Sequence, residues 1–296
     1  MKFSDYFNLQ PVQGSFEFFD IDIEVDTKNF VDPYYIVRDK SLLGIQMTRS
    51  ITGFMHQLLL HVRSDDLQQS YKLCSKFGET KGTRLGYSVK RRDGHGAGKS
   101  LSQKFVDSLF ASRAVTSGVI KHLEESSLVC EGIGKDIISD ITISLVKLQL
   151  IEFTNKVCQK YSIPVKTVSE KITYYCNINN EWKSKNFELP HVIDNGVESY
   201  LILIPEKIVP EKVSYNHSLF YSNIAIPIYK EIAIKEKRPY VAELKSGEKK
   251  VYSKDIRSDL RFKGKKSDMI DFINDNPETL MKYRQQVADY RYRKDI

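Results

Sequence analysis

Two residues near the C-terminal end of the sequence have the types and spacing needed to cut a phosphodiester bond. Glu243 and Lys245 lie in the segment Tyr-Val-Ala-Glu-Leu-Lys-Ser-Gly, and residues two apart on a strand point to the same face. A carboxylate there can hold Mg²⁺ while the neighbouring lysine positions or activates the attacking water. We therefore expect Glu243 and Lys245 to be the catalytic residues if the protein is a nuclease.

A second group of residues offers carboxylates for the metal ion. In the segment Glu131-Gly-Ile-Gly-Lys-Asp136-Ile-Ile-Ser-Asp140, the glycines allow close approach of the backbone. Asp136 and Asp140 lie one turn apart on the same side of an expected helix, and with Glu131 they would gather a hard cation such as Mg²⁺. The alternative is structural: Asp136 compensates the positive helix N-terminus, and Asp140 faces solvent or caps a neighbouring element.

A glycine-rich basic loop in the first half of the sequence offers a place for phosphate. Successive glycines expose backbone N–H groups that can cradle an anion, and Arg91, Arg92, His95 and Lys99 surround them. The loop is not a Walker A motif, because its first glycine stands one residue too close to the Gly-Lys-Ser triplet. We therefore expect no ATPase. The alternative is a polar loop that binds no ligand.

Several other signatures are missing from the sequence. It contains no His-Glu-x-x-His, Cys-x-x-Cys or Gly-x-Ser-x-Gly segment, which argues against zinc and serine hydrolysis. Its four cysteines are far apart, as expected for buried thiols in a reducing compartment. No apolar leader follows the first residues and no apolar run is long enough to cross a bilayer. We therefore expect a cytoplasmic protein without a membrane segment.

Helices and strands must both be present to position these residues. Helices are expected where apolar residues recur at helical spacing, and strands where apolar and polar residues alternate. The expected helices cover residues 41–63, 65–77, 100–110, 113–125, 136–161, 266–274 and 277–292. The expected strands cover residues 16–26, 85–90, 172–177, 182–189, 200–204 and 239–245. The fold is therefore α+β, with a mainly helical N-terminal half, a strand-rich middle segment and a basic helical C-terminal tail.

The change of texture at Pro164 suggests two regions. The first, residues 1–163, holds the long helices and the glycine-rich loop, and the second, residues 164–296, holds the strands and the basic tail. One continuous domain is the alternative, because the boundary is short and also fits a loop inside a domain.

Charge is unevenly distributed along the chain. The formal net charge is +7 and the pI is about 9.0, while residues 1–40 carry −4 and residues 230–296 carry +6. Because Lys and Arg release condensed counterions from phosphates, the basic end makes DNA or RNA the expected partner. A solvated, lysine-rich surface is the alternative.

Several motifs together resemble a family of uncharacterised bacterial proteins that is associated with mobile elements and antiviral defence loci. The resemblance spans most of the chain and is carried by Phe19-Asp-Ile-Asp, Val31-Asp-Pro33, Glu131-Gly-Ile-Gly-x-Asp-x-x-Ser-Asp-x-Thr142, Leu201 to Pro205 and Asn276-Pro-Glu-x-Leu-x-x-Tyr283. The segment around Glu243 is also similar to the third motif of PD-(D/E)XK nucleases. These resemblances imply a defence protein that acts on nucleic acid, and the family resemblance assigns no catalytic residue.

Two functions fit these observations. The first is a Mg²⁺-dependent nuclease that uses Glu243, Lys245 and an acidic partner from residues 131–140. The alternative is a non-catalytic sensor or adaptor in a multi-protein defence complex, whose glycine-rich loop and basic tail bind nucleic acid or a protein partner.

Overall fold

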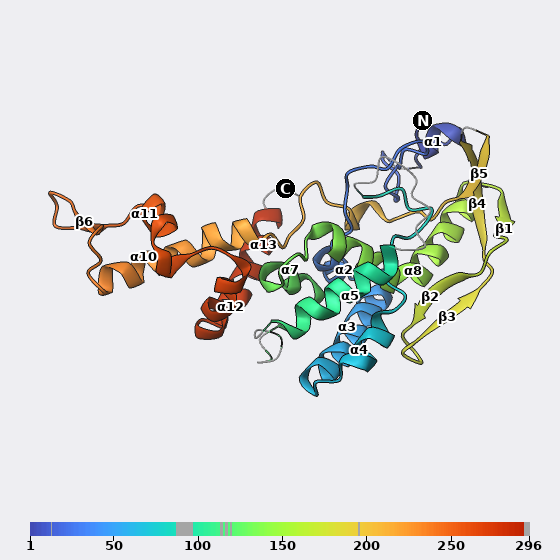
Figure 1. Ribbon diagram of the computed structural model, residues 1–296. Coiled ribbons are helices and arrows are strands. Elements are labelled where there is room, and N and C mark those ends of the chain that lie inside the picture. Colours follow the sequence, from blue (N-terminus) through green and yellow to red (C-terminus); the bar gives the residue numbers. More distant parts are fainter. Residues whose placement is uncertain are drawn as a thin grey trace.

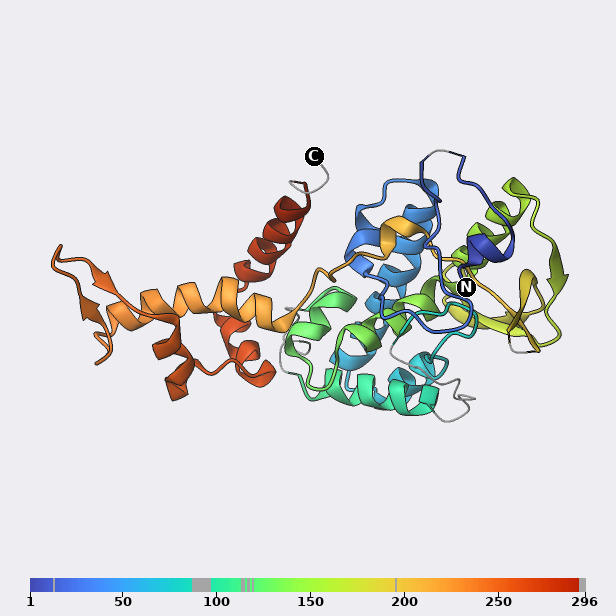
Figure 2. The same cartoon turned by 90° about the horizontal axis from the view of Figure 1, so that it is seen from above.

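The computed structural model describes residues 1–12, 14–86, 97–112, 115, 118, 120–194 and 196–292. The described residues up to 216 form a body, and residues 217–292 form an arm that projects from it (Figure 1). The body consists of helices with small sheets along one side. The arm is mostly helical, and a second view shows its outer part pointing away from the body (Figure 2).

Two long helices, α3 (Leu42–Arg63) and α8 (Lys135–Lys160), pack against each other in the body. Ser41 begins α3, because its hydroxyl accepts a hydrogen bond from the Gly44 N–H at 3.2 Å. Helix α3 buries one face, whereas α8 is buried on most sides. A helix that is buried on most sides carries apolar residues around its circumference, so those of α8 are not confined to one stripe. Helix α8 thus lies at the centre of the body.

Shorter helices complete the helical part of the body. They are α1 (Phe3–Tyr6), α2 (Pro33–Arg38), α4 (Leu67–Cys74), α5 (Ala97–Phe110), η1 (Leu123–Glu125), α7 (Ser126–Val129) and η2 (Glu206–Ile208). Asp32 begins α2: its carboxylate accepts a hydrogen bond from the Tyr34 N–H at 2.9 Å, and Pro33 takes the first helical position.

Short antiparallel strands lie beside α8. They are β1 (Val165–Thr167), β2 (Ile172–Cys176), β3 (Glu181–Lys185), β4 (Glu188–Asp194) and β5 (Val197–Tyr200), in a three-stranded sheet of order β1-β4-β5 and a hairpin of β2 and β3. Both β2 and β4 contact α8. Asn180 in the hairpin turn has a φ of 56°, a conformation that asparagine tolerates in tight turns. The predicted strand 172–177 is confirmed as β2, and the predicted strand 182–189 covers most of β3 and the start of β4.

The arm begins with a continuous helical run of α9 (His217–Phe220), η3 (Tyr221–Ala225) and α10 (Ile226–Lys235). The widened π turn of η3 precedes Pro227, which has no N–H to donate within an α-helix. The arm continues with β6 (Ala242–Glu243), β7 (Lys249–Lys250), α11 (Ser253–Ser258), η4 (Leu260–Phe262), α12 (Lys266–Asp275) and α13 (Glu278–Tyr292). Tyr229 packs against Phe262 and Phe272, with ring centres 4.7 and 5.0 Å apart, so the arm has an aromatic core.

The predicted α+β class is confirmed, as is the order of helical, strand-rich and helical parts. Helices α3, α5, α8, α12 and α13 lie where helical spacing predicted them. Buried residues on both sides of Pro164, such as Val157 and Tyr175, belong to one core cluster, and the division at 163/164 stays a prediction. None of the helices in the described ranges combines the length and apolar content of a membrane span.

The predicted strand over residues 16–26 is wrong. The segment bends at residues 23–25 and makes only isolated bridges to distant segments. Ile21 and Ile23 are buried as the alternation predicted, but Val25 is 51% exposed, and Phe18, which the alternation placed outside, is 1% exposed. Because no neighbouring strand continues the ladder, the side-chain directions do not keep a period of two along the segment.

Other predicted elements are shorter than expected. Residues 201–204 are buried but form no strand, the described residues of 120–125 form only η1, and β6 covers two residues of the predicted 239–245. Residues 87–90 of the predicted strand 85–90 lie outside the described residues. The apolar run at residues 201–204 predicted burial correctly, although strand pairing depends on a partner that the run itself does not specify.

Candidate nucleic-acid interface

The arm carries most of the excess positive charge. Residues 217–296 hold 18 Lys and Arg against 12 Asp and Glu, a net charge of +6, whereas the first 216 residues carry +1. Because opposite charges attract a polyanion over several ångströms in physiological salt, the arm is the part of the chain where a nucleic acid would concentrate.

A pocket of about 430 Å³, which we call the basic pocket, lies in the arm. It is lined by His217, Ser218, Tyr221, Arg257, Lys263, Gly264 and Lys265. Helices α9 and η3 contribute one set of these residues, and α11 and the segment between η4 and α12 contribute the other. The three cations among them are exposed, and these lining residues include no carboxylate. Such a set of donors suits a phosphate or a phosphodiester.

Arg257 is held in place by its neighbours. Its guanidinium lies 5.3 Å from the centre of the Tyr221 ring, and its Nη2 donates to the Ser222 hydroxyl at 3.0 Å. The Tyr221 hydroxyl donates to the Phe262 carbonyl at 2.8 Å, and burial raises the pKa of this tyrosine. The guanidinium has five N–H donors, so it keeps donors for an anion while its orientation is restricted.

A glycine lets the walls of the basic pocket pack closely. A Cβ atom at Gly264 would lie 2.6 Å from Cε1 of Tyr221, which leaves room only for glycine. His217 lies beside it, with Nδ1 2.9 Å from the Leu128 carbonyl oxygen and Nε2 2.6 Å from the Gly264 carbonyl oxygen. The imidazole therefore touches the basic pocket and the body at once.

The predicted metal ligand Glu131 lies at the joint between body and arm. Its carboxylate accepts a hydrogen bond from the Ser267 backbone N–H at 3.3 Å, in the first turn of α12, where negative charge is favourable. The neighbouring Lys266 ammonium donates to the backbone carbonyl groups of Cys130, at 3.1 Å, and Ile133. This segment of the body thus docks the N-terminus of α12.

The other two predicted ligands, Asp136 and Asp140, lie on α8 in the body. Asp136 is exposed and Asp140 is half-buried. Burial, together with the negative charges of Glu79 and Asp136, raises the pKa of Asp140 to about 7. Within the part of the chain that the structure describes, no three His, Cys, Asp or Glu side chains are grouped to hold a metal ion. The Mg²⁺ site stays a prediction.

The predicted catalytic pair, Glu243 and Lys245, lies at the β6-β7 hairpin of the arm. Glu243 pairs with Lys249 across the hairpin, and Lys245 follows in the turn, so the two residues do not share one strand. Both side chains are exposed. In both views the hairpin lies at the far end of the arm from α8 (Figures 1 and 2). The structure therefore does not bring Glu243 together with Asp136 and Asp140.

The predicted phosphate-binding loop is largely outside the described residues. Arg91, Arg92 and His95 lie there, and Lys99 lies in the first turn of α5. This loop stays a predicted phosphate site.

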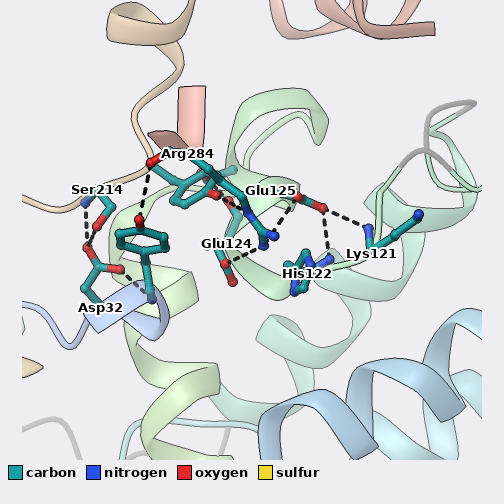
Figure 3. A network of polar contacts seen from close by, with 10 residues as sticks. Asp32, Lys121, His122, Glu124, Glu125, Ser214 and Arg284 are labelled. Carbon is teal, nitrogen blue, oxygen red and sulfur yellow. Dashed lines mark hydrogen bonds and ion pairs between the residues drawn. The ribbon is translucent and has the colours of Figure 1, made fainter. Parts of the chain in front are cut away.

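The sequence patterns did not reveal a buried polar network where α13 meets the body (Figure 3). Arg284 of α13 lies 3.3 Å from the Glu124 carboxylate and 3.6 Å from that of Glu125. Asp32 accepts hydrogen bonds from the backbone N–H and the hydroxyl of Ser214, at 2.5 and 2.6 Å. The network joins the start of α2, the short helix η1 and the chain that leads into the arm.

Burial controls the electrostatics of this network. Glu124 is 3% exposed, and burial raises its pKa to about 7 although Arg284 is close. Burial also lowers the pKa of His122 to about 4, so this ring is neutral at physiological pH. Two consecutive glutamates are usually exposed on the surface. The sequence therefore did not predict that Glu124 and Glu125 are buried. The adjoining cavity of about 10 Å³ has room for no more than a water molecule, and the ion pairs of Arg284 join α13 to the body.

A protein-family model described as a domain of unknown function (DUF8370) matches residues 8–216. No curated protein and no solved structure matches the chain. The matched residues lie in the body, and the residues of the basic pocket follow them in the sequence.

Proposed function

The chain belongs to the DUF8370 family, and we propose that it binds nucleic acid through its arm. The observation that carries this proposal is the basic pocket, to which Arg257, Lys263 and Lys265 contribute cations and no lining residue contributes a carboxylate. All three can donate to phosphate oxygens. Because Arg257 is already stacked on Tyr221, it loses less conformational freedom on binding than a free side chain would.

A long polyanion suits the arm better than a free phosphate does. Exposed lysines extend the positive charge beyond the basic pocket to the hairpin and the start of α11: Lys245, Lys249, Lys250 and Lys254. A free phosphate would contact the pocket alone, whereas a polynucleotide would contact both regions. Each phosphate that is neutralised releases counterions, so the longer ligand gains more.

The sequence resemblance supports a proposal for the biological setting. We assign the protein the role of a nucleic-acid-binding sensor or adaptor in a bacterial defence complex. Binding without hydrolysis is supported by the separation of Glu243 in the hairpin from Asp136 and Asp140 on α8 (Figure 1).

The proposal is tested by removing charge from the basic pocket. We expect the triple variant Arg257→Gln, Lys263→Gln, Lys265→Gln to bind a fluorescently labelled nucleic-acid 30-mer at least about 10-fold more weakly than the wild-type protein does. Anisotropy titrations measure this affinity. The slope of log K against log salt should fall by about 2 to 3, because up to three phosphate contacts are lost. The matched control removes three exposed lysines of the body, Lys72→Gln, Lys76→Gln and Lys171→Gln. Equal losses in both variants would contradict a specific role of the pocket.

A cleavage assay tests the predicted hydrolytic activity separately. Supercoiled plasmid, linear duplex and single-stranded RNA are incubated with the protein and Mg²⁺ or Mn²⁺, with EDTA as the control. From the separation of the predicted residues we expect binding without cleavage. Cleavage that EDTA blocks and that Glu243→Gln abolishes would instead establish the metal-dependent nuclease, with Glu243 as its metal-holding residue.

A further inference from the structure

Tyr252 is an exposed aromatic residue of the arm. It precedes the first residue of α11 and is 45% exposed, whereas its neighbours Val251 and Ile256 are buried. Among the Phe, Tyr and Trp residues whose burial the structure describes, it is the one in the exposed class. The backbone under the ring is thus anchored while the ring itself faces solvent.

Cations surround this exposed ring. The ammonium groups of Lys250 and Lys254 lie 5.1 and 5.7 Å from the ring centre. Arg257, on the same short helix α11, lines the basic pocket. Lys254 and Arg257 are three residues apart on α11, so they lie on one side of this helix, one beside the ring and the other in the wall of the pocket. Both lysines are exposed and have long side chains, so their ammonium groups can turn to phosphates while a planar group takes the ring face.

The chemistry of this arrangement distinguishes paired from unpaired nucleic acid. In a duplex the faces of the bases are stacked on one another, and a protein reaches only their edges and the backbone. In a single strand the faces are available, and proteins combine aromatic rings with basic grooves to hold them. A ring that served only duplex binding would gain nothing from exposing its face.

We infer that Tyr252 stacks on an unpaired base and that the preferred ligand of the arm is single-stranded nucleic acid. This inference rests on the proposed function, because it requires the phosphates that flank the stacked base to be held by the basic pocket and its neighbouring lysines.

The test compares a single-stranded 15-mer with a duplex of the same sequence. The wild-type protein should bind the single strand more tightly. Tyr252→Ala should lose about 5- to 150-fold in affinity for the single strand, the range expected for one base–aromatic stack, and less than about 2-fold for the duplex. Tyr252→Trp should keep the single-strand affinity, and its indole fluorescence should be quenched on binding. The matched control is Leu260→Ala, which truncates an exposed apolar side chain of the arm.

The outcomes separate this inference from the proposed function. If Tyr252→Ala binds the single strand as tightly as wild type while the pocket triple variant loses affinity, the stacking inference is overturned and the arm remains a nucleic-acid binder. An equal loss on both ligands overturns it as well. If the wild-type protein binds neither ligand, the proposed function itself fails.

Discussion

Asp140 is the carboxylate of the body whose surroundings change its chemistry most visibly. It lies on α8 with Asp136 one turn before it and Glu79 facing it. Burial and these two negative charges all disfavour the ionised form, so its pKa rises from 3.8 to about 7. The sequence predicted the one-turn spacing correctly, but Glu79 is 61 positions away in the chain, and no local pattern connects the two.

Replacement of Asp140 by asparagine should therefore stabilise the protein in a pH-dependent way. The pKa of Asp140 is higher in the folded state than in the unfolded chain. Its contribution to the free energy of unfolding is therefore fully present below pH 4 and is lost as the pH rises to about 7. Asp140→Asn removes that loss, so its free energy of unfolding should exceed that of wild type by on the order of 2 kcal/mol at pH 8 and by little at pH 4. Urea unfolding at the two pH values measures the difference.

The exposed Asp136→Asn variant is the control for Asp140→Asn and should show a smaller gain. Parallel stability profiles of Asp140→Asn and wild type from pH 4 to 8 would show that Asp140 ionises normally.

Helix α13 is held by both ionic and aromatic contacts. Its Arg284 faces Glu124 and Glu125, both buried in the body, and its Tyr283 packs edge-on against Phe220 with ring centres 5.3 Å apart. Removal of the guanidinium would leave buried carboxylates without a cation, which costs more than the pair itself contributes.

The variant Arg284→Met should thus be destabilised by on the order of 3 kcal/mol, with the loss concentrated in α13. Hydrogen exchange of the α13 amides measures this local loss. The double variant Arg284→Met, Glu124→Gln should recover part of it, because one of the unpaired charges is gone. No recovery in the double variant would mean that Arg284 acts through packing alone.

Secondary-structure elements differ in how far the sequence determined them. Helix α3 was predictable because its apolar residues recur at helical spacing over many turns. Helix α8 was predictable because its residues include no glycine or proline before Pro164 stops it, and the β2-β3 hairpin because Asn179-Asn180 supplies the turn. The strand expected over residues 16–26 failed, since pairing requires a neighbour that local alternation does not specify. For the same reason β6 is too short to hold Glu243 and Lys245 on one face.

In the whole molecule, the residues that were predicted to form one catalytic site lie apart. The predicted acidic segment is divided between the α12 docking site, where Glu131 lies, and the body helix with Asp136 and Asp140. The basic tail predicted from charge alone became an arm with a pocket, which requires α9, α11 and the chain before α12 to meet. Charge counting could predict a basic tail, but only tertiary packing could bring the residues of the pocket together.

His217 gives the arm a mechanical connection to the body. One edge of its ring lines the basic pocket, and the other lies against the Leu128 carbonyl of α7. A ligand that displaces this ring must either break that hydrogen bond or carry the end of α7 along with it. The imidazole thus joins the Gly264 wall of the basic pocket to α7 of the body, so a shift of either wall changes a contact of the other.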